Sequence, residues 1–435
     1  MMNETISGNG GKTWLAVYLA KLAGIFVGCI ALFFILMVLI WCIPDEWVSE
    51  NQAESLAVFD EDGDIHEYPF TREELKWAWV FSHTRGAQVD NREEYGMILN
   101  VMSDTPEASV FYKAMSCNDY ARYWHGYLAY LRPMMVLFSY LQIRYIIMFA
   151  YLLLGVAVVL RLQKNFGNGM VYLWTLCFCC IYPIVLPFSM SYSAVFFILA
   201  AGILIIDRAY SHKKNLSTEK SGALFLIMGM LTSFIDVQTA PFLSLGLPLI
   251  YLMLLEHTGD GNSLRRNMWN LVNASVTWGF GYAGCWSMKW VLASPIVGYN
   301  VVLEGIANAQ RRIDAEGGAT GERALESVKA VAMNLFAMLP PGITSEDWKW
   351  FFCVVFLILA ILVVLFVKFH VDKENLKSLL PFLIVAVYPY VWYVVLANQT
   401  SVHYIFTYRL QLITLLGISI AYSKAVRIRR TRPKE

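Results

Sequence analysis

Residues that could hold a phosphate are most concentrated in the segment 119–133, which reads DYARYWHGYLAYLRP. Arginine presents a planar fork of donors that matches phosphoryl oxygens. If the segment is helical, Arg122, His125 and Arg132 fall within roughly 80° of arc, because successive helical residues are about 100° apart. The pattern predicts either a clamp for a phosphate or pyrophosphate headgroup, or an ordinary interfacial helix whose cations snorkel toward water. Arg144 is expected one step deeper.

Carboxylates that could act as a general base lie in the same part of the chain. Asp45 and Glu46 directly follow a long apolar stretch, and Asp90 precedes a predicted helix. Transfer of a sugar needs a carboxylate that takes a proton from the acceptor hydroxyl, and cations or a metal that hold the departing phosphate. Asp45, Glu46 and Asp90 are therefore the candidate catalytic residues. Each also has a structural interpretation, as a solvated loop start for the first two and as a helix N-cap or surface charge for Asp90.

Three further polar residues lie in connections between apolar stretches. Asp236 is in the turn SFIDVQTAP, where a carboxylate is costly in a membrane unless it is paired or faces water. His403 and Arg409 are in the connection NQTSVHYIFTYR and could approach the same cavity. We expect all three to bind substrate, with simple turn chemistry as the alternative for Asp236. No ligand spacing typical of a metal site occurs, so no metal ligand is assigned, and a requirement for a divalent cation stays open.

The elements that must position these residues are membrane helices. Of the 435 residues, 57% are hydrophobic and only 15% are charged, and the mean hydropathy is +0.50. A helix needs about 20 apolar residues to cross a bilayer. The composition predicts an all-α, polytopic integral membrane bundle of about ten spans. The candidate spans are 14–43, 143–160, 170–186, 193–206, 221–235, 241–255, 268–292, 350–367, 379–396 and 410–425.

The distribution of Lys and Arg predicts the orientation. Cytoplasmic connections carry an excess of these residues. Alternate connections of this chain are basic, at 161–164, 208–220, 265–266 and 368–377, and the tail after residue 426 is basic too. We therefore expect a multi-pass protein of the cell membrane with both termini in the cytoplasm. The first apolar stretch is too long for a removable signal peptide and is expected to remain as an anchor.

Two long connections are predicted on the extracytoplasmic side. They divide the chain into a cytoplasmic N-terminus with the first span (1–44), a helical loop ending in an interfacial helix (45–132), spans (133–296), a second helical loop (297–349), and spans with a basic tail (350–435). The first loop is rich in Trp and Tyr and is expected to form a helical cap, with a helix start at Thr105 and Pro106. The second should form two helices, 301–315 and 322–338.

The order of these features resembles the GT-C glycosyltransferases, membrane enzymes that take a sugar from a polyprenyl-phosphate carrier. The shared features are an N-terminal anchor, acidic residues directly after it, a large first outer loop with a short interfacial helix, and a proline, Pro133, beside the second span. The resemblance implies a GT-C-like fold and a catalytic acid in that loop, which points to Asp45, Glu46 or Asp90. The acidic pair that continues into an Arg-Tyr segment, usual in the family, is absent after Glu46.

Most of the sequence also resembles an uncharacterised family of bacterial polytopic membrane proteins. The segment 123–133 carries that resemblance, with Asp236 and the segment 403–409 in similar places. It covers most of the chain, and its motifs are distinctive for membership, not for activity.

These observations favour a glycosyltransferase that moves a sugar from a polyprenyl-phosphate carrier to a cell-envelope glycan or lipid acceptor on the extracytoplasmic face. The expected partners are membrane lipids, the lipid-linked sugar donor and the acceptor, and nucleic acid is not among them. The alternative is a non-catalytic carrier or flippase for lipid-linked glycans, and a third hypothesis is a structural subunit of an envelope complex. A transporter should place polar features in matched spans near mid-membrane, whereas here they gather at one surface.

Overall fold

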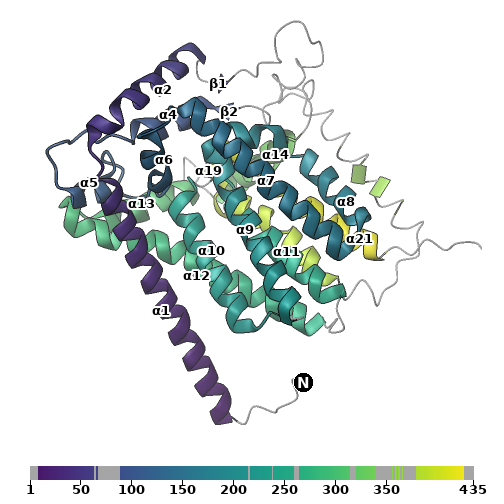
Figure 1. The fold of residues 1–435 in the computed structure, drawn as a ribbon. Helices are drawn as coiled ribbons and strands as arrows, with labels where there is room; N and C mark the ends of the chain where they lie inside the picture. Colours follow the sequence, from purple (N-terminus) through teal and green to yellow (C-terminus); the bar gives the residue numbers. More distant parts are fainter. Residues whose placement is uncertain are drawn as a thin grey trace, which may run out of the picture.

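The fold is helical throughout the described residues, apart from one short antiparallel pairing (Figure 1). This computed structural model describes residues 8–62, 65–66, 89–213, 216–237, 239–258, 264–313, 320–338 and 379–425, with the isolated positions 355, 358–359, 361–362 and 365. The all-α class expected from composition is confirmed at this level.

The helices and strands occur in the following order, with η denoting a 3-10 helix. They are α1 (Gly8–Ile40), η1 (Asp45–Trp47), α2 (Ser49–Asp62), β1 (Ile65–His66), β2 (Val89–Asp90), α4 (Asn91–Leu99), α5 (Val110–Ser116), α6 (Leu128–Met135), α7 (Tyr140–Phe166), α8 (Asn168–Cys179), η3 (Pro183–Phe188), α9 (Met190–Lys213), α10 (Thr218–Ile235), α11 (Leu243–Thr258), α12 (Leu264–Val297), α13 (Val301–Ile313), α14 (Thr320–Phe336), α17 (Leu380–Ala386), α18 (Tyr388–Val395), α19 (Ala397–Val402), α20 (Tyr404–Thr407), η5 (Tyr408–Leu410) and α21 (Gln411–Ala425).

Four helical segments are long and apolar enough to cross a membrane. They are Thr13–Ile40, Tyr140–Phe166, Met190–Ser211 and Tyr404–Ala425. The apolar helices α8 and α11 are shorter, and the stretch expected to be one span at 379–396 is divided into α17 and α18 at Val387. The expected span at 350–367 lies largely outside the described residues. The structure is thus consistent with a membrane protein, while the count of about ten spans stays a prediction.

The centre of the bundle is the contact between α10 and α12. Gly229 of α10 lies against the backbone carbonyl of Trp278, and Gly281 of α12 lies against that of Leu226. A β-carbon at either glycine would collide with the opposite backbone, so both positions require glycine for this close approach. Such small-residue contacts are typical of helix packing in membranes, where van der Waals contact replaces the hydrophobic driving force.

Around this pair the apolar core forms two clusters. One contains buried residues of α7 to α12, α17 and α21, and the other contains residues of α1, α4, α5 and α6 with α10 and α12. Because α10 and α12 belong to both clusters, they connect the first outer segment of the chain to the rest of the bundle.

The segment expected to form a cap contains helices at one end of the bundle. In Figure 1, α2, α4 and α5 lie at the end where α1 finishes, and the N-terminus lies at the opposite end. The prediction that a helix starts at Thr105 and Pro106 is wrong. Helix α5 starts at Val110 instead, because the Ser109 hydroxyl accepts the backbone N–H of Tyr112 at 3.2 Å and caps it.

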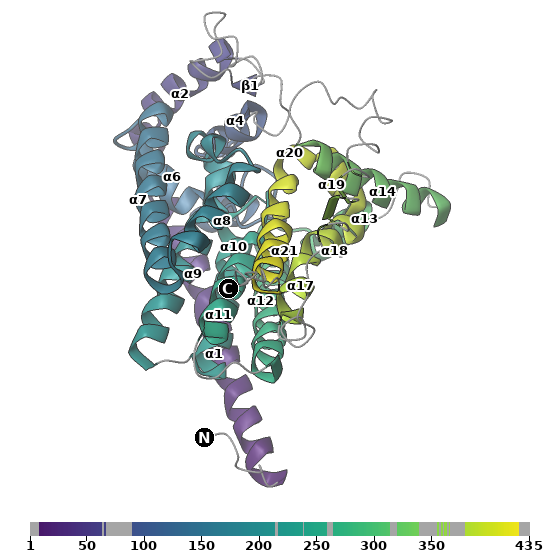
Figure 2. The same ribbon diagram turned by 90° about the vertical axis from the view of Figure 1, so that its right-hand side faces the viewer.

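The two helices expected in the second long connection are confirmed as α13 and α14. The left-handed Gly298, with φ of +82°, separates α12 from α13. Figure 2 shows α13, α14 and α19 grouped together, with α14 projecting sideways from the bundle. Helix α14 packs against α19 through Asn334, whose side-chain amide donates to the carbonyl of Thr400 at 3.0 Å.

Candidate functional site

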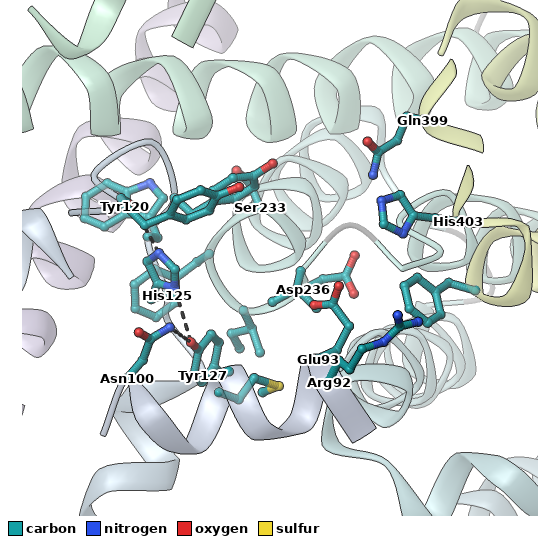
Figure 3. A pocket seen from close by; sticks show the side chains of 18 of the residues that line it. Arg92, Glu93, Asn100, Tyr120, His125, Tyr127, Ser233, Asp236, Gln399 and His403 are labelled. Carbon is teal, nitrogen blue, oxygen red and sulfur yellow. Dashed lines mark hydrogen bonds between the residues drawn. The ribbon is translucent and has the colours of Figure 1, made fainter. Parts of the chain in front are cut away.

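A cavity of about 330 Å³ lies where the cap meets the bundle. Its polar lining comes from five parts of the chain (Figure 3): α4 with Asn100 just after it, the segment before α6, the end of α10, α13, and α19 with His403 at its end. The lining residues with polar or titratable side chains are Arg92, Glu93, Asn100, Tyr120, Tyr123, His125, Tyr127, Ser233, Asp236, Arg312, Gln399 and His403. A cavity with an apolar body and a few converging polar groups is typical of a ligand site.

The segment 119–133 is not the continuous helix that its periodicity predicts. Helix α6 begins only at Leu128, and the residues before it form turns with left-handed backbone at Cys117, Asn118, Asp119 and His125. Asn and Asp tolerate this conformation better than most residues, because their short polar side chains bond locally. The expected cationic helical face therefore does not form, and Arg122, His125 and Arg132 point to different partners.

His125 lines the cavity as a neutral residue. Its Nε2 lies 3.1 Å from the carbonyl of Tyr120, which only accepts, so Nε2 carries the proton. Its Nδ1 then accepts the hydroxyl of Tyr127 at 3.2 Å, and that hydroxyl accepts the amide of Asn100 at 3.0 Å (Figure 3). Burial, together with the nearby positive Lys289, lowers the pKa of His125 to about 3. His125 is thus a positioned neutral donor and acceptor, whereas the sequence pattern placed it among the cations.

A short turn with no room for a side chain brings this segment against α10. The N–H of Gly126 donates to the carbonyl of Phe234 at 2.8 Å, and a β-carbon at Gly126 would collide with that same residue. The contact places His125 and Asp236 on the walls of one cavity. The glycine is required here because two backbones approach within hydrogen-bonding distance.

An aromatic wall is held by an ion pair and a hydrogen bond from α13. Tyr120 and Tyr123 stack with ring centroids 5.2 Å apart and planes 7° from parallel. Arg122 pairs with Glu304 of α13, and Arg312 of α13 donates to the Tyr123 hydroxyl. Arg122 itself is not among the residues lining the cavity, and it contributes by holding α13 against the aromatic wall.

Asp236 is the predicted acid that the structure places in the cavity. It is buried at the C-terminal end of α10, and its Oδ1 accepts the hydroxyl of Thr239 at 2.6 Å and the backbone N–H of the same residue at 3.4 Å. Figure 3 shows the carboxylates of Asp236 and Glu93 both directed into the space between His125 on one side and His403 on the other. The turn contact considered for Asp236 is therefore present, and it fixes one carboxylate oxygen in the wall of a cavity.

Arg132 and Asp45 form an ion pair away from the cavity lining. The guanidinium, 1% exposed, donates to the carbonyls of Ile40 at 3.0 Å and Ile43 at 2.6 Å, to that of Val101, and to the Asp45 carboxylate at 2.6 Å. Four acceptors nearly use up its five N–H groups. Arg132 therefore closes the C-terminal end of α1, where helix carbonyls lack intrahelical partners. Glu46 is exposed on η1.

Arg144 and Arg409 are buried cations that stack on aromatic rings. The Arg144 guanidinium lies 4.5 Å from the ring of Tyr140, and that of Arg409 lies 4.1 Å from the ring of Tyr192. Arg409 also donates to the carbonyl of Ile405 at 2.7 Å. Neither is among the residues lining the cavity. Asp90 pairs through its backbone with Ile65, and its side chain lies outside the described residues.

The residues that sequence reasoning missed are Arg92, Glu93, Arg312 and Gln399. Arg92 and Glu93 lie two and three residues after Asp90, so the segment DNREEY contained a signal, and sequence reasoning selected only Asp90 from it. Their neighbour Glu94 explains why that helix is fixed. Its buried carboxylate accepts hydrogen bonds from the hydroxyls of Ser189 at 2.6 Å and Ser191 at 2.8 Å, at the start of α9.

Among the described residues, no three His, Cys, Asp or Glu side chains gather closely enough to share a metal ion. Comparisons of this chain with protein-family models, with curated proteins and with solved structures find no match. The chemistry of the cavity therefore has to be argued from its own residues.

Proposed function

We propose that the chain is a membrane glycosyltransferase that moves a sugar from a polyprenyl-phosphate carrier to a hydroxyl of a cell-envelope glycan or lipid, within the cavity beneath α13. The observation that carries the proposal is the convergence in one cavity of two carboxylates, Asp236 and Glu93, with two guanidinium groups, Arg92 and Arg312, and an aromatic wall. Sugar transfer from a phosphate uses all three kinds of group.

In this proposal Asp236 is the general base. Its carboxylate takes the proton of the acceptor hydroxyl while the hydroxyl oxygen bonds to the anomeric carbon of the donor sugar. The bond between that carbon and the phosphate oxygen breaks, and polyprenyl phosphate leaves with the electron pair. The bond from Thr239 orients the carboxylate, which lowers the cost of reaching the reactive geometry. Glu93 is the second candidate for the same role.

The cations of the cavity would stabilise the leaving phosphate. Arg92 and Arg312 enter from different elements, so they can contact one phosphate from two directions. The neutral His125 adds a fixed polar edge, and the stacked Tyr120 and Tyr123 offer an apolar face to the sugar ring. The proposal transfers the catalytic role from Asp45, Glu46 and Asp90, which the sequence suggested, to acids that line the cavity.

The reaction is assigned to the extracytoplasmic face with both termini cytoplasmic. Support comes from the arrangement of basic residues at the end of the bundle that contains the start of α1. There Lys21 pairs with Glu219 at 2.7 Å, Arg266 with Glu256 at 2.9 Å, and Arg161 with Asp207 at 3.5 Å. Basic connections favour the cytoplasm. The cavity lies by the other end of α1.

The test is release of polyprenyl phosphate by the purified full-length protein in lipid, supplied with a panel of polyprenyl-phosphate sugars and acceptors. We expect Asp236→Asn to lower kcat/KM by about 100-fold or more, the usual contribution of a general base, with binding of the donor retained. Glu54→Gln, at an exposed position of α2, is the matched control and should transfer normally. Donor binding without any release by the wild-type protein would contradict transfer and favour the carrier. Full activity in both Asp236→Asn and Glu93→Gln would contradict the assigned base.

A further inference from the structure

The amphipathic helices α13 and α14 are oriented opposite to the arrangement found on a water-facing surface. A helix of a soluble protein buries its apolar side and leaves its polar side in water. In α13 the side that faces the protein carries the buried Val301 and Gly305, and its other contacts there are made by polar residues. Glu304 pairs with Arg122, and Arg312, two helical turns later on the same face, bonds to Tyr123. The outward residues are Leu303 and Ile306, which are 64% and 45% exposed.

Helix α14 repeats this arrangement. Asn334 is fully buried and bonds to Thr400 and Thr407, and Glu326, eight residues earlier on the same face, accepts the hydroxyl of Ser401. On the other side Leu325 and Val328 are 70% and 63% exposed. Two successive helices thus bury hydrogen-bonding groups and present branched apolar side chains outward. In water this would leave apolar side chains of both helices exposed, which is unfavourable.

The level of α13 along the bundle indicates what covers these faces. Gly305 packs on Trp290, in the last turns of α12. The residue before Trp290, Lys289 of α12, donates to the carbonyl of Met115 at 2.9 Å and so joins α12 to α5. Helix α5 in turn meets α1, where Phe111 stacks on Phe34 with centroids 6.2 Å apart. Helix α13 therefore lies level with the last turns of a candidate membrane span, whose outward residues are apolar up to Leu39.

We propose that α13 and α14 lie in the surface layer of the lipid bilayer, with Leu303, Ile306, Leu325 and Val328 inserted among the acyl chains and headgroups. The occupant of this surface is lipid, because α13 lies level with the end of a candidate spanning helix whose exposed residues are apolar, and Trp47, 63% exposed just after that helix, has the position of an interfacial aromatic. Since the inner face of α13 supplies Arg312 to the cavity, a headgroup would reach the cavity directly from the membrane surface. The inference requires a membrane location but no particular reaction.

The test uses the full-length protein with p-benzoylphenylalanine placed singly at positions 303, 306, 325 and 328, in vesicles of phosphatidylethanolamine and phosphatidylglycerol. Ultraviolet irradiation followed by mass spectrometry identifies what each position attaches to. Position 27, exposed on α1, is the lipid-facing control, and position 57, on α2, is the control outside the membrane. Each variant must elute as the wild-type protein does before it is irradiated.

We expect phospholipid adducts at all four positions with yields within about threefold of position 27, and none at position 57. Attachment to a second protein copy would overturn the proposal in favour of an oligomer interface. Adducts at position 27 with none on α13 and α14 would overturn it in favour of a water-facing surface. Because no activity is measured, neither result depends on whether the chain transfers sugar.

Discussion

His125 shows how burial changes the chemistry that a residue type suggests. Beside two arginines in the sequence, a histidine looks like part of a cationic site. In the structure its two ring nitrogens are both engaged, one as donor to the carbonyl of Tyr120 and the other as acceptor from Tyr127. A proton on the second nitrogen would break the bond from Tyr127 and leave a charge buried without a carboxylate in contact, which is why the pKa falls.

The lowered pKa of His125 predicts how stability depends on pH. The folded state holds this histidine neutral until about pH 3, whereas the unfolded chain protonates it near its ordinary value of about 6.5. Between these values the unfolded state binds more protons. This residue therefore lowers the free energy of unfolding as the pH falls below 6.5, by at most about 1.4 kcal/mol per pH unit, and has no effect above 6.5.

Denaturant unfolding of the detergent-solubilised protein between pH 4 and pH 8 measures this effect. His125→Asn is the matched variant, because asparagine tolerates the left-handed backbone with φ of 51° but does not titrate. We expect the variant to lose part of the pH dependence seen in the wild-type protein below pH 6.5. Identical slopes for the two proteins would show that His125 does not contribute.

At the scale of elements, the cap is joined to the bundle by polar contacts at helix ends. Arg132 of α6 closes the end of α1 and pairs with Asp45 of η1, while Glu94 of α4 binds the start of α9. Helix termini have unpaired carbonyl and N–H groups, so charged side chains of the right sign are favoured there. Arg132, which the sequence suggested as a phosphate ligand, and Asp45, which it suggested as a catalytic acid, are thereby engaged in structural contacts.

Substitution of Arg132 separates the structural role from a role in phosphate binding. We expect Arg132→Ala to lower the free energy of unfolding by about 3 kcal/mol, because it leaves three carbonyls and one carboxylate without their donor. Lysine should restore only part of the loss, since it has no planar fork. Chemical denaturation measures the change.

Glu46→Gln provides the control for this prediction. Glu46 is adjacent to Asp45 but exposed, so its substitution should change the free energy of unfolding by no more than about 0.5 kcal/mol. If Arg132→Ala unfolds with wild-type stability yet fails to bind a lipid-linked donor, the capping role is contradicted and the phosphate clamp is favoured.

At the scale of the whole molecule, the two ends of the bundle differ in chemistry. One end has basic residues around the start of α1 and the ends of α7, α9 and α11. The other has the helices of the cap (Figures 1 and 2), among them α4, which contributes Arg92 and Glu93 to the cavity. In a membrane, the end with the basic residues is expected to face the cytoplasm. The cavity would then open to the extracytoplasmic side, where envelope glycans are assembled.

Labelling of intact cells tests this orientation. In a Cys42→Ser background, Ala57→Cys on α2 should react with a membrane-impermeant maleimide before the cells are permeabilised. Lys164→Cys, exposed near the end of α7, should react only afterwards. The reverse pattern would place the cavity in the cytoplasm and would remove the extracytoplasmic part of the proposed function.

The helical class, the apolar first helix and the two helices α13 and α14 could be predicted from the sequence, because composition, length and periodicity are local properties. Asp236 and His403 could be selected as candidate site residues for a similar reason, since a polar residue between apolar stretches is costly unless it is paired or faces water. The sequence could not separate Arg122, His125 and Arg132, because their helical spacing holds only if the backbone is helical there, and the left-handed residues before Leu128 make it otherwise.

Only the tertiary structure decided which polar residues meet. Arg312 reaches the cavity because α13 folds back over the segment before α6, almost 190 residues away, where Arg312 bonds to Tyr123. Arg132 leaves the set because the carbonyls at the end of α1 come within its reach. Contacts between distant segments decide which buried charge has a structural partner and which faces a cavity. The order of residue types along the chain contains no measure of the distances between those segments.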